Sequence, residues 1–327
     1  MKSWINSYLG GADVKRIVLI ILACLLFTGC TGAAKAEKTV FAMDTVMNLQ
    51  IWGTDGEKAA QSFAQMLKVL EETWAVNGEK SVVSSLNQGT AELTEEQQMV
   101  IQRVQALSDR TGGAFNPWLG KLSQVWGFYD GANQKEDFHL PSQEQIRTAA
   151  GEKRWDLGAA IKGYAGDRAV QILESMNVEC AILNLGGNVQ TYGTKPNGEA
   201  WRIGIQNPWG GDNIGVIAVE GTCSVVTSGD YQRYFEKDGV RYHHILNPET
   251  GYPANSGLSS VTVVCRDGMT ADGLSTALFV MGLENAGKFW RQSDDFEAVF
   301  LLNDGTVYAT EGVRLTGCKY EVITREK

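Results

Sequence analysis

RYHHILNPETGYP, residues 241–253, is the stretch that indicates the fold of this chain most clearly. It holds His243 and His244, two of the three histidines in 327 residues, so few other side chains can exchange protons near neutral pH. Directly before it, Asp238-Gly239 lies between two β-prone runs, which predicts a β-hairpin with a two-residue turn. The Asn-Pro and Tyr-Pro pairs that follow the histidines predict a turn that ends the strand.

The turn also sets the register of the hairpin. It predicts three cross-strand pairs: Phe235–Tyr242, Glu236–Arg241 and Arg233–His244. Because side chains alternate across a strand, His244 should share an apolar face with Val240, Tyr242 and Leu246, whereas His243 should share the charged face with Arg241. His244 is thus a candidate base at the start of a loop. The alternative is a histidine that only completes a hydrogen bond in the core.

The first 38 residues predict export. Lys15-Arg16 precede the apolar run IVLIILACLLFTG, which is too short to span a bilayer and is typical of a signal peptide. Thr28-Gly29-Cys30 resembles a lipobox, which predicts a signal peptide at residues 1–29, a lipid such as palmitate on Cys30 and a short tether at 30–38. We therefore expect a lipid-anchored protein on the extracytoplasmic face of a bacterial membrane. The alternative is a secretory signal that is cut near Ala33-Ala34.

The amino-acid composition limits the kinds of partner that this protein can bind. The chain has 29 Lys and Arg residues against 38 Asp and Glu, a net charge of −9, and residues 1–29 hold three of the basic side chains. An acidic protein of this kind is a poor candidate for nucleic-acid binding, because phosphates attract basic patches. Cys180, Cys223, Cys265 and Cys318 are widely spaced and form no C-x-x-C pair, which disfavours a zinc site. Buried thiols and two disulfides both remain open for them.

Hydrophobic periodicity predicts an α+β fold with helices mainly in the first half and antiparallel strands in the second. The length, near 300 residues without the signal, allows one large domain or two intimate lobes, and we place the folded domain at residues 39–325. Helices are expected at 57–74, 94–111, 117–127, 142–150, 159–176, 270–281 and 284–290. Strands are expected within 39–52 and at 180–184, 201–205, 214–219, 222–227, 240–246, 258–264, 297–302 and 306–310.

Two segments carry oxygen and nitrogen groups in patterns suited to a metal and a phosphate. On the helix expected after Thr270, Asp272 and Thr276 are four residues apart, so both oxygens lie on one face, and such hard ligands suit Mg²⁺. Asp272 could instead only complement the helix dipole. In WDLGAAIKGYAGDRA, residues 155–169, a turn after Asp156 leads to Lys162, which can meet phosphate oxygens at a helix N-terminus. The alternative there is a helix cap with a solvated lysine.

Two further turns follow strands. Gly186-Gly187 forms a bend without obstructing side chains, and Thr227-Ser228-Gly229-Asp230 ends a strand in small polar residues. Together with the segments above, seven stretches in this order resemble the ApbE family of FAD:protein FMN transferases over about residues 39–325. They are GAFNPWLGKLSQVWGF (113–128), DLGAAIKGYAGDRA (156–169), LNLGGNVQTYG (183–193), WRIGIQNP (201–208), TSGDYQRYF (227–235), HHILNPETGYP (243–253) and TADGLSTALFVMG (270–282).

The resemblance implies a single ApbE-like (T-fold-like) domain that uses Mg²⁺ and FAD to attach FMN to a threonine of flavin-carrying subunits of membrane redox complexes, or of FMN-binding-domain proteins. Carried over by position, the metal ligands fall on Asp272, Thr276 and the Ala159 carbonyl, with Ser275 close by. Flavin contacts fall on Met43, Asn77, Ala114, Phe115, Asn116, Asp156, Lys162, Gly186, Gly187, Ser228, His244 and Ile245. Catalytic roles fall on His244 as base, Lys162 as electrostatic partner, and Asp230, which would replace or orient the histidine.

Three positions depart from the family pattern. Asn116 stands where many relatives have aspartate, and Asp44 where many have glycine. Asn77 occupies a flavin-contact position that is aromatic in other members, and some relatives with a small polar residue there hydrolyse FAD. The alternatives to transfer are therefore a Mg²⁺-dependent FAD pyrophosphatase that releases FMN and AMP, and a non-catalytic FAD-binding lipoprotein.

Overall fold

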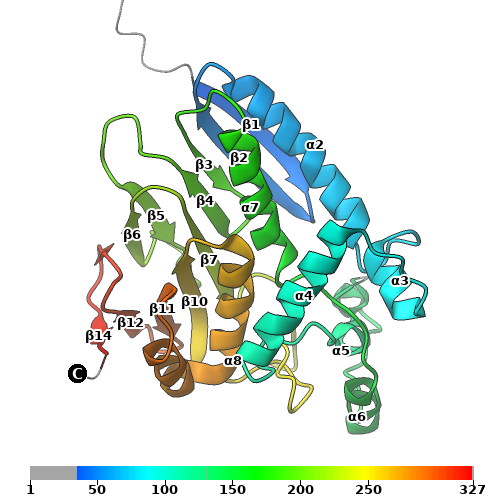
Figure 1. The fold of residues 1–327 in the computed structure, drawn as a ribbon. Helices are drawn as coiled ribbons and strands as arrows, with labels where there is room; N and C mark the ends of the chain where they lie inside the picture. The colour runs from blue at the N-terminus through cyan, green and yellow to red at the C-terminus, as the bar shows by residue number, and fades with distance from the viewer. Residues whose placement is uncertain (1–34, 130, 326–327) are drawn as a thin grey trace, which may run out of the picture. The chain divides into compact units, whose positions relative to one another are not determined.

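The computed structural model describes residues 35–129 and 131–325, whose main feature is a nine-stranded mixed sheet (Figure 1). Its neighbours pair antiparallel, except for the last pair, which is parallel. In spatial order the strands are β1 (Lys35–Ala42), β2 (Thr45–Trp52), β3 (Cys180–Asn184), β4 (Asn188–Tyr192), β7 (Cys223–Gly229), β10 (Leu258–Cys265), β11 (Phe296–Leu302), β12 (Val307–Thr310) and β14 (Glu321–Ile323).

Helices pack on one face of this sheet and a second, smaller sheet covers the other. The helices are α2 (Gly56–Trp74), α3 (Val82–Gln88), α4 (Glu95–Arg110), α5 (Gly120–Val125), α6 (Gln143–Gly151), α7 (Ile161–Glu174) and α8 (Gly268–Arg291), with a 3₁₀ turn at Ala132–Gln134. Of these, α2, α7 and α8 contact the large sheet (Figure 1). The smaller sheet has the order β13 (Leu315–Thr316), β6 (Gly215–Val219) and β5 (Trp201–Ile205).

Side-chain alternation explains how one sheet serves two cores. Val226 of β7 lies in the larger core beneath the helices, whereas its neighbour Val225 lies in the core beneath the small sheet. Both side chains are 1% exposed. A strand that is buried on both faces does not alternate between apolar and polar side chains, and the polar residues within β7 (CSVVTSG) and β10 (LSSVTVVC) are small serines and threonines.

The hairpin formed by β8 (Tyr234–Lys237) and β9 (Val240–His243) has the predicted register, with Phe235 opposite Tyr242. These two rings stack at 5.2 Å, and Phe235 belongs to a third core that also contains Leu122 and Trp126 of the α5 region. The Arg233–His244 pair is confirmed as well, because the His244 N–H donates to the Arg233 carbonyl at 3.1 Å. The hairpin is thereby held against the α5 region.

The α+β class is confirmed, and most expected elements are present. Several predicted elements end at other residues than expected, and two of these differences bear on the site. The strand expected to run to Leu246 stops at His243, because the next residues turn and Ala254 donates to the Ile245 carbonyl. The helix expected from Thr270 begins at Gly268, and its cap is Asp267, whose carboxylate accepts the Thr270 N–H at 2.8 Å.

The break that separates the two helices expected near residue 282 is present inside α8, where Gly282 has a φ of 74°. The sequence interpretation missed β4, whose Asn188–Tyr192 residues follow the Gly186-Gly187 bend. It also missed the short α3 and the edge strands β13 and β14. These elements carry little periodicity of their own and are specified by what they pair with or pack against.

The predicted signal peptide, residues 1–29, and the lipid site Cys30 lie outside the described residues. The tether expected at 30–38 has its last four residues in β1, which begins at Lys35. In the described part of the chain, no helix is both long and apolar enough to cross a membrane. The four cysteines whose state the sequence left open are free thiols, and Cys180, Cys223 and Cys265 are buried.

Candidate active site

The site is built where the first turns of α7 and α8 cross. Gly163 and Gly268 form this crossing, and a Cβ on Gly163 would lie 2.0 Å from the Gly268 carbonyl oxygen. Real Cβ atoms do not approach so closely, so only glycine permits this contact. This contact brings Asp272 of α8 against the start of α7.

Asp272 is 4% exposed and sits in the second turn of α8. Its Oδ2 accepts the backbone N–H of Gly163 at 2.8 Å. Burial raises the pKa of Asp272, while Lys162 and the Gly163 N–H act in the opposite direction. Asp272 is therefore a buried carboxylate that faces another helix. Complementing the dipole of its own helix, the alternative considered from sequence, cannot be its whole role.

The Ala159 carbonyl lies just before α7. The helix begins at Ile161 with Ala160 as its cap, and its first helical bond runs from the Tyr164 N–H to the Ala160 carbonyl, so the Gly163 N–H has no acceptor in its own helix. Asp272 supplies that acceptor. Among the described residues, the Ala159 oxygen accepts no backbone hydrogen bond, and it belongs to the residue that the family resemblance assigns to the metal.

Three hydroxyl groups lie together where the end of β7 meets α8. Ser228, at the end of β7, has its Oγ 2.8 Å from Oγ of Ser275 and 3.2 Å from Oγ1 of Thr276. The Ser275 hydroxyl also donates to the Asp272 carbonyl at 2.8 Å, which anchors it to the helix. Thr276 therefore keeps the face that the four-residue spacing predicted, next to a strand end from another part of the chain.

The donor set consists of hard oxygens. The described residues contain no group of three or more His, Cys, Asp or Glu side chains arranged to hold a metal, so a site made only of such side chains is absent from this part of the chain. One carboxylate, one free carbonyl and one or two hydroxyls match the way Mg²⁺ binds, since this ion uses few protein ligands and completes its shell with water or phosphate oxygens. The residues present fit that ion.

Cationic side chains lie near Asp272. Burial lowers the pKa of Lys162, the negative charge of Asp272 raises it, and Arg233 lowers it further. Lys162 is half-buried, so it is not the fully solvated lysine considered from sequence. Burial, followed by the charge of Arg233, lowers the pKa of His244 to about 3, with smaller effects from His243 and Lys162. The His244 ring is therefore neutral, with the charges of Lys162 and Arg233 near it.

The two histidines have different surroundings from those predicted. His243 is the core histidine: it is 6% exposed, its Nε2 lies 3.0 Å from the Ala254 carbonyl and its ring meets Phe279 edge-on. The prediction that it lies on a charged face was wrong, because that face packs against α8. His244 is half-buried beside Phe128, as the apolar face predicted. Its Nδ1 lies 3.2 Å from the Arg233 carbonyl.

Asp230 pairs with Arg241 and not with His244, the partner considered from sequence. Its carboxylate lies 3.9 Å from the Arg241 guanidinium, and burial raises the pKa of Asp230 while Arg241 lowers it. No contact joins it to His244 in the described residues. Asp230 therefore lies at the end of β7, near the site, but its charge is directed at the hairpin.

The β1–β2 turn and the glycine bend lie together. Met43 and Asp44 have φ values of 50° and 59°, which explains why glycine suits the second position. A Cβ on Gly186 would lie 2.2 Å from the Thr45 hydroxyl, so the bend adjoins this turn, and the Gly187 carbonyl accepts the Thr227 N–H. A cavity of about 330 Å³ borders Gly187 between the two sheets.

The remaining predicted flavin contacts surround the helix crossing at varied depth. Phe115 is 2% exposed and its ring lies against Gly273 of α8. Asp156 accepts the Gly158 N–H at 2.9 Å and the Tyr129 hydroxyl at 2.7 Å. Ala114 and Asn116 flank Phe115 and are half-buried, Ile245 is buried beyond His244, and Asn77 is exposed in the turn after α2.

Three residues near the site were not predicted to act in it. Arg233 was placed opposite His244 by the hairpin register, and that pairing was a usable signal for its effect on the histidine. Asn188 is 4% exposed, and its amide faces Asp272 and lowers the pKa of that carboxyl. Glu71 accepts the Met43 N–H at 2.8 Å, a contact 28 residues apart that no local pattern indicates.

Taken together, these features describe an α+β protein in which a buried carboxylate, hydroxyl groups and cationic side chains gather around the N-termini of two helices. Residues 43–300 match the ApbE family model. The chain belongs to the ApbE family.

Relatives and solved structures agree with this assignment. A protein of Klebsiella pneumoniae named FAD:protein FMN transferase is 34% identical over 295 residues, which cover 84% of this chain and 91% of the relative. A Treponema pallidum protein of the same name is 29% identical over 336 residues, 90% of this chain and 93% of the relative. The crystal structure of the ApbE protein of Thermotoga maritima matches with a TM-score of 0.77 and 34% identity, covering 85% of this chain and 97% of that one. The structure of the flavin transferase ApbE of Vibrio cholerae matches with a TM-score of 0.74 and 25% identity, covering 85% of this chain and 98% of that one.

Proposed function

We propose that this protein is an FAD:protein FMN transferase, which moves FMN from FAD to a threonine hydroxyl of an acceptor protein in a Mg²⁺-dependent reaction. The observation that carries the proposal is the Asp272–Gly163 hydrogen bond, because it joins the buried carboxylate of one predicted segment to the helix start of the other, which follows Ala159 and carries Lys162. The family membership and the names of the relatives support the same activity.

Asp272, Thr276 and the Ala159 carbonyl would hold the Mg²⁺ ion, with Ser275 behind them. When bound, such an ion neutralises charge on the bridging phosphates as the bond to the leaving group breaks. Lys162 binds the same phosphates from the other side, where its low surrounding dielectric strengthens the attraction. Binding of an anion there also favours the charged form of the lysine.

His244 is the proposed base. Its Nδ1 faces a backbone carbonyl, which only accepts hydrogen bonds, so the proton belongs on Nδ1 and the lone pair on Nε2. The pKa of about 3 keeps the ring neutral at pH 7, and the incoming phosphates raise that value by attracting positive charge. The geometry thus leaves one ring nitrogen able to accept a proton from a hydroxyl group.

The reaction then balances as follows. The threonine oxygen forms a bond to the FMN phosphorus, the bond between that phosphorus and the bridging oxygen breaks, and AMP leaves with the oxygen. The hydroxyl proton passes to Nε2 of His244. The acceptors would be threonine-bearing subunits of membrane redox complexes or FMN-binding-domain proteins, reached by an enzyme that Cys30 anchors by lipid on the extracytoplasmic face of the membrane.

A pyrophosphatase is the second candidate, and Asn77 favours it. This exposed amide stands where other members have an aromatic flavin contact, and it leaves more room for water near the flavin. A pyrophosphatase would release FMN and AMP from FAD and Mg²⁺ without any acceptor. A non-catalytic FAD carrier would leave the pyrophosphate bond intact under the same conditions.

The test is mass spectrometry of a threonine-bearing acceptor domain after incubation with enzyme, FAD and Mg²⁺. We expect the acceptor to gain the mass of FMN in step with AMP release, and little FMN or AMP in its absence. If free FMN appears without the acceptor, the protein is a pyrophosphatase that hydrolyses FAD. If FAD stays unchanged with and without the acceptor, the protein is not an enzyme that acts on FAD. His244→Ala should reduce transfer by roughly 10²- to 10⁴-fold. Full activity in that variant would place the base elsewhere.

A further inference from the structure

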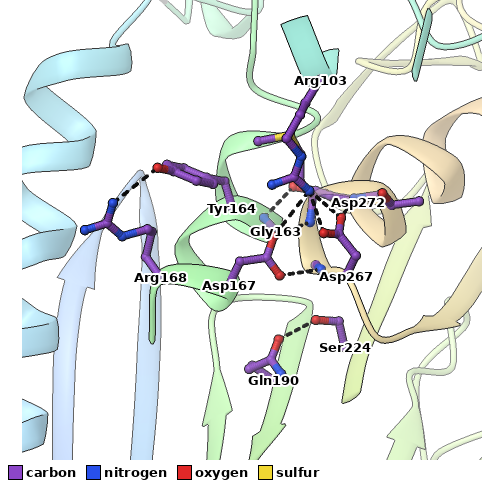
Figure 2. Close-up of polar contacts among 12 residues, drawn as sticks. Arg103, Gly163, Tyr164, Asp167, Arg168, Gln190, Ser224, Asp267 and Asp272 are labelled. Carbon is purple, nitrogen blue, oxygen red and sulfur yellow. Dashed lines mark hydrogen bonds and ion pairs between the residues drawn. The ribbon is translucent and has the colours of Figure 1, made fainter. Parts of the chain in front are cut away.

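The crossing of α7 and α8 has a second contact, one helical turn beyond Gly163. Asp167 of α7 accepts the Gly268 N–H on Oδ1 at 2.6 Å and the Met269 N–H on Oδ2 at 3.1 Å (Figure 2). These are the first two N–H groups of α8, which have no partner within their own helix. One carboxylate therefore spans the start of the helix that carries Asp272.

A second carboxylate and a guanidinium complete this contact. Asp267, the cap of α8, binds Nη2 of Arg103 from α4 at 2.6 Å. The same nitrogen lies 3.8 Å from Oδ2 of Asp167, so one cation bridges both acids (Figure 2). Burial, and then the nearby charge of Asp267, raises the pKa of Asp167 to about 6. Arg103 offsets the repulsion between the two acids.

The position of α8 along α7 decides whether the Gly163 N–H has an acceptor. This N–H lies in the first turn of α7, where N–H groups have no partner within their own helix, and Oδ2 of Asp272 accepts it at 2.8 Å. If α8 moved away by about 1 Å, this bond would lengthen beyond hydrogen-bonding range. The carboxylate proposed as a metal ligand would then lose the contact that fixes its position against α7.

We propose that Asp167 is a positioning residue for the metal site. By clamping the first turn of α8 onto α7, it keeps the Asp272 carboxylate on the Gly163 N–H and so holds this carboxylate in position for the ion. Asp167 lies one helical turn after Gly163, and its side chain contacts the N–H groups of Gly268 and Met269 and the guanidinium of Arg103. The inference rests on the proposed function, since it concerns the affinity of that same site for its cation.

The test compares the Mn²⁺ affinity of Asp167→Asn with that of the wild type. Mn²⁺ binding is measured by electron paramagnetic resonance, with and without FAD. The amide has nearly the shape of the carboxylate but keeps only one acceptor oxygen for two N–H groups. We expect Mn²⁺ affinity to fall by roughly 10- to 100-fold, as for other residues that orient a metal ligand. FAD affinity without metal should stay unchanged, a result that general loss of structure would not give.

The matched control is Asp295→Asn. Asp295 binds Arg110, also from α4, through two contacts of 2.6 and 2.7 Å, but it lies at the start of β11 and does not touch the start of α8. Its loss should lower the melting temperature and leave Mn²⁺ affinity as in wild type. Arg103→Gln is a second test, because it leaves the Asp167 carboxylate in place and removes the cation that bridges it to Asp267. This variant should also bind Mn²⁺ more weakly than the wild type.

The outcomes separate the two proposals. Unchanged Mn²⁺ affinity in Asp167→Asn, or an equal loss in Asp295→Asn, overturns the positioning role while the metal site stands. Should Asp167→Asn not fold, unchanged affinity in Arg103→Gln overturns it instead. A wild-type protein that binds Mn²⁺ no better than Asp272→Ala would overturn the metal site and the positioning role with it.

Discussion

The backbone N–H of Gly163 donates to the Asp272 carboxylate, 109 residues further along the chain, at 2.8 Å. This bond joins the two segments that sequence reasoning singled out separately, one for phosphate and one for a metal. It also gives an acceptor to an N–H in the first turn of α7, which has none within its own helix. The site depends on the geometry of that helix crossing, which can be tested directly.

Gly163→Ala should disrupt the crossing. The new Cβ would lie 2.0 Å from the Gly268 oxygen and 2.7 Å from Cβ of Asp272, and neither is the end of a flexible side chain. We expect a loss of about 1–3 kcal/mol in the free energy of unfolding, together with loss of Mg²⁺-dependent activity. Gly151→Ala is the control, because nothing lies within 4 Å of its Cβ. It should stabilise the protein by about 0.4–1 kcal/mol in urea denaturation. Wild-type stability and activity in Gly163→Ala would contradict the crossing.

Asp272→Asn should abolish metal-dependent transfer with little change in fold. The amide oxygen still accepts the Gly163 N–H, but the negative charge is lost. We expect activity to fall by more than the roughly 10- to 100-fold that removing a supporting residue costs a metal site, and added Mg²⁺ should not restore it. The pKa of Lys162 should fall further, because Asp272 raises it in the wild type. Retention of Mg²⁺-dependent activity would remove Asp272 from the ligand set.

Arg233→Met should raise the pKa of His244. The Arg233 charge is the largest contribution after burial to the low value of about 3, and the substitution keeps the backbone carbonyl that holds Nδ1. The measurement is an NMR titration of ring protons, which is simple in a chain with three histidines. Arg241→Met is the control, since Arg241 acts on His243 instead. An equal response of His244 to both substitutions would refute the charge arrangement.

His243 should make the protein less stable below neutral pH. Burial lowers its pKa to about 4, against an ordinary value near 6.5, so the unfolded chain binds a proton between these values that the folded chain does not. Stability contributed by the neutral ring is complete above pH 6.5 and is lost as the pH falls towards 4. Between pH 7.5 and 5 the loss is about 2 kcal/mol.

His243→Gln should lose that pH dependence, because glutamine can donate to the Ala254 carbonyl without titrating. The measurement is the difference in unfolding free energy between wild type and variant across this pH range. His244 titrates in both proteins, so its effect cancels in the difference. A constant difference from pH 7.5 to 5 would show that His243 is solvated or protonated in the folded protein.

Local chemistry allowed much of the fold to be predicted. The Asp238-Gly239 turn determined the hairpin register, including the pairing of Arg233 with His244. The capping box at Thr94 determined the start of α4, where Thr94 accepts the Gln97 N–H and Gln97 in turn accepts that of Thr94. Each of these signals acts within a few residues, so the sequence displays it directly.

Burial and partners beyond a few residues could not be read in this way. His243 lies on the face that alternation assigned to charged residues, but α8 covers that face, and periodicity does not reveal which element covers a strand. The state of the cysteines and the strand β4 depended likewise on neighbours distant in the chain.

The sequence by itself determined the class, the hairpin, the helix caps and the residue types of the site, because propensity, capping and turn chemistry are local. Only the tertiary structure decided that Gly163 and Gly268 touch, that the Gly163 N–H donates to Asp272, and that Asp167 spans the start of α8. The physical reason is that a hydrogen bond between helices depends on their crossing to within about an ångström, a quantity fixed by packing and not by spacing along the chain.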